Sequence, residues 1–241
     1  MQKSESVLGW AFGGITLNNT QRITLSSPDE VSRRLDELGL SVEPIREARK
    51  RGLSASLECT PSHAPTAAGT YAYHETVRWL RDLLKPLGWV SSDVQNRGLT
   101  VNSTETRALI VASGDEDTGI VTGNPSTRNP KGSTTVQAVR DNTIGWLFSE
   151  MEEDRERQAR ISKMETWIML IFRDDDKGQF RSELSLPIST NDRLCPDLFR
   201  ERIILDVIDF NNASILNAIP MNPVSPAGQS PEVIVEIKRR A

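Results

Sequence analysis

The stretch TGNPSTRNPKGSTT, residues 122–135, holds the residues whose chemistry is easiest to state. It combines two cations, Arg128 and Lys131, with the hydroxyls of Ser133 and Thr134, and it runs into a helical pattern, VQAVRDN. Cations and the free amides at a helix start bind anions, so the stretch predicts an anion site. The order KGST excludes the nucleotide phosphate loop, which needs GK followed by Ser or Thr. A surface connector is the preferred alternative, because Gly, Pro, Asn, Ser and Thr are common in loops.

A second group of cations lies in the sequence SVEPIREARKRGL. The group consists of Arg46, Arg49, Lys50 and Arg51. The preceding stretch SSPDEVSRRLDEL is also helical, so the two stretches have the layout of a helix-turn-helix whose second helix would contact DNA phosphates. Glu43 and Glu47 lie on the same helix and would repel phosphates. A plain helical hairpin is therefore the preferred interpretation.

Acidic residues at strand ends predict a third kind of site. Asp115 and Asp117 follow an apolar strand, where carboxylates can hold Mg²⁺. Glu236 and Lys238 in EVIVEIK have the spacing of a metal-dependent nuclease, in which a carboxylate holds the metal and a lysine assists water. Acidic residues are also common in turns, and charged residues alternate with apolar ones along a strand. These structural explanations are preferred to a metal site.

Cysteine and histidine offer little further chemistry. The chain has two cysteines, Cys59 and Cys195, and two histidines, His63 and His74, without the spacing of a zinc site or a disulfide framework. Cys59 and His63 share a Pro-rich loop but have no third group to orient them as nucleophile and base. We therefore expect no cofactor.

Composition limits the class of protein. The chain has 241 residues, of which 37% are hydrophobic and 26% charged, and a formal net charge of −4. The balance argues against a non-specific nucleic-acid binder, which usually has an excess of basic residues. There is no signal-peptide pattern at the N-terminus and no apolar run near the ~20 residues of a membrane span. We expect a soluble cytoplasmic protein that does not contact a membrane.

Hydrophobic periodicity gives the elements that must position these residues. Helices are expected over residues 28–38, 42–52, 71–85, 135–140 and 149–164. Strands are expected over residues 6–17, 21–27, 107–112, 200–210 and 230–240, together with a β-hairpin around Gly178 that starts near residue 166. The resulting fold class is α+β, with a mixed or mostly antiparallel sheet, helices packed on it and a β-rich C-terminal half.

The domain division has two open versions. The chain divides into residues 1–120, a Gly- and Pro-rich loop with a short helix over 121–145, and residues 146–241, or one sheet continues across that loop. The leading functional hypothesis is a non-enzymatic binding or accessory protein that acts through a protein partner or by self-association, since long polar loops often carry recognition. A nucleic-acid-associated protein and a metal-dependent hydrolase are the two alternatives.

Overall fold

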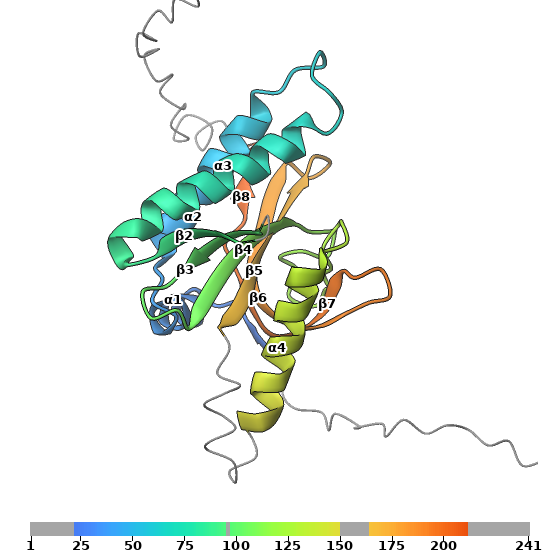
Figure 1. Cartoon of the computed structure of the whole chain (residues 1–241). Coiled ribbons are helices and arrows are strands. Elements are labelled where there is room, and N and C mark those ends of the chain that lie inside the picture. The colour runs from blue at the N-terminus through green and yellow to red at the C-terminus, as the bar shows by residue number, and fades with distance from the viewer. Residues whose placement is uncertain (1–21, 95–96, 150–163, 212–241) are drawn as a thin grey trace, which may run out of the picture.

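A computed structural model describes residues 22–94, 97–149 and 164–211 (Figure 1). Within these residues the fold is α+β, and its second half is rich in strands, as the sequence predicts. The helices are α1 (Pro28–Glu37), α2 (Val42–Leu57), α3 (Ala67–Leu84) and α4 (Ser133–Ser149), and a 3₁₀ turn, η1 (Lys85–Leu87), follows α3.

One mixed sheet joins the described strands in the order β1-β7-β6-β5-β4-β3-β2, and β8 pairs with β6 beside that path. The β1–β7 and β4–β5 pairs are parallel and the other pairs are antiparallel. The strands are β1 (Ile23–Leu25), β2 (Val90–Val94), β3 (Arg97–Val101), β4 (Arg107–Ser113), β5 (Glu165–Asp174), β6 (Gln179–Thr190), β7 (Pro196–Ile204) and β8 (Ile208–Asp209).

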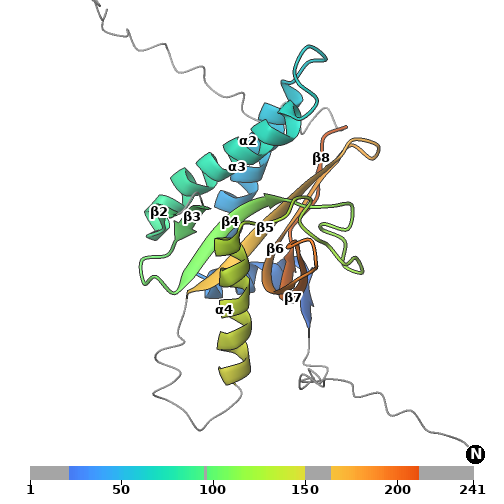
Figure 2. The same ribbon diagram turned by 45° about the vertical axis from the view of Figure 1, so that its right-hand side comes forward.

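Both faces of this sheet are buried at its centre. In β4, Leu109 and Val111 join the larger core, which also contains the apolar residues of α1, α2 and α3. The alternate residues Ala108, Ile110 and Ala112 join a second core on the opposite face, as the two-residue period of a strand requires. Figures 1 and 2 show α2 and α3 side by side over one face and α4 across the other.

Local sequence patterns predicted several elements correctly. The Ser27 side chain accepts a hydrogen bond from the Glu30 amide at the start of α1, where Pro28 stands at the first helical position. Gly88 adopts a left-handed conformation with φ of 85° and closes the α3–η1 segment. Gly178, with φ of 64°, lies in the tight turn between β5 and β6, which confirms the hairpin.

Other expected boundaries were wrong. Helix α2 continues five residues beyond Gly52, because this glycine does not end the helix but lets α3 approach it closely. Helix α3 begins at Ala67, so the predicted loop is shorter than expected, and α4 extends to Ser149 rather than ending at Arg140. The β2–β3 hairpin was missed, since VSSDV and RGLTV are short and only weakly apolar.

Three expected elements lie largely or wholly outside the described residues: the strands over 6–17 and 230–240 and the helix over 149–164. The segment 121–145 lies between β4 and β5, and these two strands pair in parallel along residues 107–113 and 165–171. One sheet thus contains strands from both sides of that segment.

Candidate functional site

The loop between β4 and α4 folds back along the end of the sheet. The Gly114 amide donates to the Ile171 carbonyl at 2.9 Å, and the Arg128 amide donates to the Ser113 carbonyl at 2.9 Å. The Lys131 amide donates to the Leu194 carbonyl, in the connection between β6 and β7, at 3.0 Å. Backbone contacts therefore hold the loop at both ends and fix where the Arg128 and Lys131 side chains begin.

A buried ion pair in the sheet holds the middle of the same loop. Glu183 of β6 is fully buried, and the Arg202 guanidinium of β7 donates to it, with Nε to Oε1 at 3.0 Å. Arg202 also donates to the carbonyls of Ile120 and Gly123, and the Gly119 amide donates to Glu183 Oε2 at 2.9 Å. The sequence analysis missed this pair, although a lone acid in SELSLPI and a lone cation in ERIIL are unusual within apolar strands.

The acidic residues after β4 organise the loop. Asp115 Oδ1 and Oδ2 accept from the amides of Asp117 and Ser126, at 3.2 and 2.8 Å. Asp117 Oδ2 accepts from the Asn124 amide at 3.1 Å. Burial raises the pKa of Asp115, although its backbone hydrogen bonds oppose that rise. Both carboxylates thus have a structural use as acceptors for loop amides.

The predicted metal site lies only partly within the described residues. Among residues 22–94, 97–149 and 164–211, no group of three or more His, Cys, Asp or Glu side chains is arranged to hold a metal ion. Glu236 and Lys238, the other half of the predicted site, lie outside the described residues. The hypothesis of a metal-dependent hydrolase therefore stays a prediction.

The cations of α2 are engaged with the fold. The side chain of Arg49 is 1% exposed, and its Nη1 donates to Asp206 Oδ1 at 2.8 Å. Arg46 Nε donates to Asp206 Oδ2 at 3.0 Å. Arg51 donates to Glu47 Oε1 at 2.7 Å, and its guanidinium carbon lies 4.3 Å from the centre of the Trp79 ring. Lys50 is half-buried, and nucleic-acid binding by this helix stays a prediction.

The two cations of the 122–135 loop have different surroundings. Within the described part of the chain, neither Arg128 nor Lys131 has an ion pair with a carboxylate. Arg128 is exposed and lies 5.8 Å from the centre of the Phe172 ring, a contact that leaves its charge uncompensated. Burial lowers the pKa of Lys131, and Cys195 opposes this change only in part.

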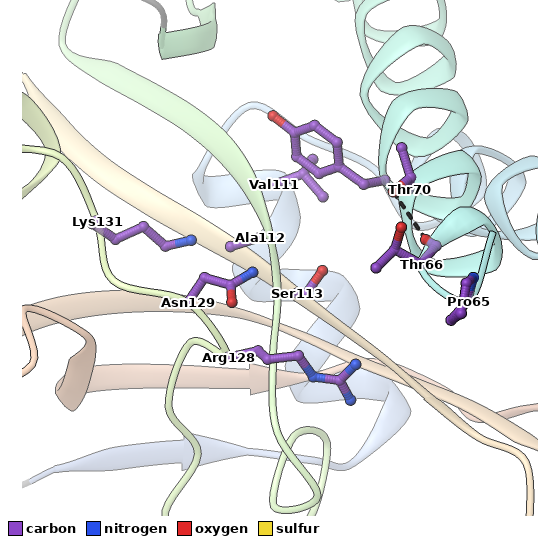
Figure 3. A pocket seen from close by; sticks show the side chains of 11 residues that line it. Pro65, Thr66, Thr70, Val111, Ala112, Ser113, Arg128, Asn129 and Lys131 are labelled. Carbon is purple, nitrogen blue, oxygen red and sulfur yellow. Dashed lines mark hydrogen bonds between the residues drawn. The ribbon is translucent and has the colours of Figure 1, made fainter.

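Arg128 and Lys131 line the same cavity, whose volume is about 520 Å³. The cavity lies between the first turns of α3, the end of β4 and the 128–131 segment (Figure 3). Figure 3 shows Arg128, Asn129 and Lys131 on the loop side, with Thr66 and Thr70 opposite them at the start of α3. Among the described residues, no carboxylate lines this cavity. Its wall thus combines two cations with neutral hydrogen-bonding groups.

The remaining wall is partly apolar. Val111 and Ala112 of β4 line the cavity, and Tyr73 of α3 adds an aromatic ring. Ser133 and Thr134, which the sequence grouped with the two cations, stand at the first two positions of α4 and do not line this cavity. The structure thus brings Arg128 and Lys131 together with residues of α3 and β4 that the sequence analysis did not single out.

Comparison with protein-family models, with curated proteins and with solved structures gave no match for this chain. Among the described residues, no helix has both the length and the apolar character needed to cross a membrane.

Proposed function

We propose that this protein binds a small anionic ligand in the cavity between α3, β4 and residues 128–131. The observation that carries the proposal is the pair of cations, Arg128 and Lys131, in a cavity whose described wall has no carboxylate. A partly desolvated ammonium without a counter-ion is unfavourable, and a bound carboxylate or phosphate would offset that cost.

Size and rigidity support the same proposal. The volume of about 520 Å³ lies within the range of sites that hold small molecules, roughly 300–1,000 Å³. The backbone bonds to Ser113 and Leu194 fix the backbone of both residues before a ligand arrives. A ligand therefore loses less free energy to ordering the loop on binding.

The experiment is titration of the purified protein with inorganic phosphate and, separately, with acetate, followed by calorimetry. Lys131→Met and Arg128→Met are each expected to weaken binding by roughly tenfold or more, since a hydrogen bond to a charged group contributes about 1.5–3 kcal/mol. Lys177→Met is the matched control, because Lys177 is exposed on the β5–β6 turn and contacts Asp174. Absence of binding by both anions, or an equal effect of Lys177→Met, would contradict the proposal.

The pH dependence gives an independent readout. Because burial lowers the pKa of Lys131, the ammonium loses its proton at a lower pH than a free lysine, and anion affinity should fall as the pH rises toward 10.5. Lys131→Arg keeps the positive charge throughout this range and should remove the alkaline loss. An unchanged alkaline profile in Lys131→Arg would show that another group titrates.

The wider role is also a proposal. The ligand-bound protein would act as an accessory protein in the cytoplasm, in agreement with the two free cysteines, Cys59 and Cys195. Association with a protein partner or with nucleic acid is tested by pull-down from the native cell and by anisotropy with labelled DNA and RNA across a salt series. Binding to nucleic acid through phosphates weakens steeply as salt rises.

A further inference from the structure

A second cavity of about 220 Å³ adjoins the first. Pro65, Gly69, Ser113 and Arg128 line both cavities, so they meet between the start of α3 and the end of β4. Gly69 has no atom within 4 Å of the place where a Cβ would stand, so the space beside this residue is open. A ligand that enters the first cavity therefore has neighbouring space to fill.

More apolar and aromatic residues line the second cavity than the first. Its apolar wall comes from α3 and from the β5–β6 hairpin, through Ala68, Ala72, Ile171, Phe172 and Phe180. The small side chains of Ala68 and Ala72 leave the room that larger residues would fill. These residues give an apolar or aromatic group of a ligand a surface to pack against.

Arg173 and Asp175 also line the second cavity, where they form an ion pair with each other. Arg173 Nε donates to Asp175 Oδ1 at 2.7 Å, and Arg173 Nη1 donates to the Ser56 carbonyl at 3.0 Å. Arg173 therefore adds no free positive charge. The uncompensated charge lies with Arg128, which lines both cavities, and with Lys131, which lines only the first.

We infer that the ligand is amphipathic: an anionic group binds at Arg128 and Lys131, and a compact apolar or aromatic group occupies the cavity beside Phe172. This inference rests on the proposed function. The chemical class is an aryl or short alkyl chain that bears a carboxylate or a phosphate monoester. The anionic group supplies binding to the cations, and the apolar part supplies the free energy of burial.

The test compares four probes by calorimetry: inorganic phosphate, phenyl phosphate, acetate and benzoate. Burial of a phenyl ring should make phenyl phosphate or benzoate bind on the order of tenfold more tightly than its small counterpart. The better of the two pairs identifies the anionic group. Benzyl alcohol, which has the ring without the charge, should bind more weakly than either aryl anion.

Two variants distinguish the contributions of the two cavities to binding. Ala68→Leu fills only the second cavity and should abolish the advantage of the aryl anions while leaving the affinity for phosphate or acetate unchanged. Lys131→Met should weaken all four anions and preserve the ratio between aryl and small probes. Asp82→Asn, at an exposed residue of α3 that lines neither cavity, is the control for changes in α3, and thermal unfolding of each variant confirms that it is folded.

The outcomes distinguish the two proposals. If small anions bind as tightly as aryl anions, or if Ala68→Leu leaves the aryl advantage intact, the amphipathic ligand is wrong and the anion site remains. If no anion binds, both proposals fail. If benzyl alcohol binds as well as benzoate, the second cavity binds apolar groups but the anion site is wrong.

Discussion

Helix α2 and the segment 128–131 contain the same kinds of residue in opposite surroundings. In α2, Arg46 and Arg49 both donate to Asp206, and Arg49 is almost completely buried. In the loop, Arg128 and Lys131 face a cavity and have no carboxylate partner among the described residues. Charged side chains thus join elements of the fold in one region and line a cavity in the other.

A glycine in α2 and a glycine in the cavity wall also have opposite surroundings. A Cβ added to Gly52 of α2 would lie 2.0 Å from Thr76 Oγ1 and 2.7 Å from the Ala72 carbonyl oxygen. A Cβ added to Gly69, at the wall of the two cavities, would meet no atom within 4 Å. The α2–α3 interface is closed around its glycine, whereas the cavity wall is open around its own.

The largest effect is expected from Gly52→Ala. The added methyl group would force α2 and α3 apart and lower the free energy of unfolding by about 3 kcal/mol, as overpacking of a core does. Urea denaturation followed by circular dichroism measures the change. In the double variant with Thr76→Ala, removal of Oγ1 should restore part of the loss, and full additivity of the two changes would contradict the close approach.

An intermediate effect is expected from Asp206→Asn. This change leaves Arg49 buried without its counter-ion and should cost about 2 kcal/mol, less than for a fully buried pair because Asp206 is partly exposed. Lys131→Met should change the free energy of unfolding by less than about 0.5 kcal/mol, since it removes no ion pair. Equal losses of unfolding free energy in the two variants would contradict the proposed difference between the two regions.

The dependence of stability on pH gives a second check of the ion pair between Asp206 and Arg49. Burial opposes ionisation of Asp206, but Arg49 and Arg46 outweigh it and hold the pKa of Asp206 below its ordinary value. The contribution of the pair is therefore complete above the unfolded pKa of about 3.9 and is lost as the pH falls through the folded pKa. Stability curves of the wild type and Asp206→Asn should converge below pH ~4.

The smallest effect is expected from Gly69→Ala. Alanine replaces a flexible residue in the first turns of α3 without a clash, so the free energy of unfolding should rise by about 0.5–1 kcal/mol. A higher midpoint of thermal unfolding measures this gain. A destabilised variant would show that the wall near Gly69 is already filled.

The elements that the sequence predicted correctly depend on residues close to one another in sequence. The capping pattern at Ser27 and Pro28 predicted the start of α1, and the turn at Gly178 predicted the β5–β6 hairpin. The predicted end of α2 at Gly52 was wrong, because a glycine that ends a helix and a glycine that allows a second helix to pack closely look alike in sequence. Only the position of α3 tells them apart.

The candidate site could be predicted only in part. Arg128 and Lys131 stand out by residue type, but nothing local predicts that Thr66, Thr70 and Tyr73, some sixty residues earlier, form the opposite wall. The pair Glu183 and Arg202 was missed for the same reason, since its partners in the loop are distant in sequence. Contacts of this kind follow from the strand order, which sequence patterns leave open.

By itself the sequence determined the α+β class, the helices and hairpin with strong caps or turns, and the clusters of cations. The tertiary structure alone decided which cations are neutralised. Arg49 and Arg128 are the same residue type with the same charge, and the path of the chain places Asp206 beside one and a cavity beside the other. The strength of a charge depends on its partners and its exposure to water, and both are properties of the folded chain.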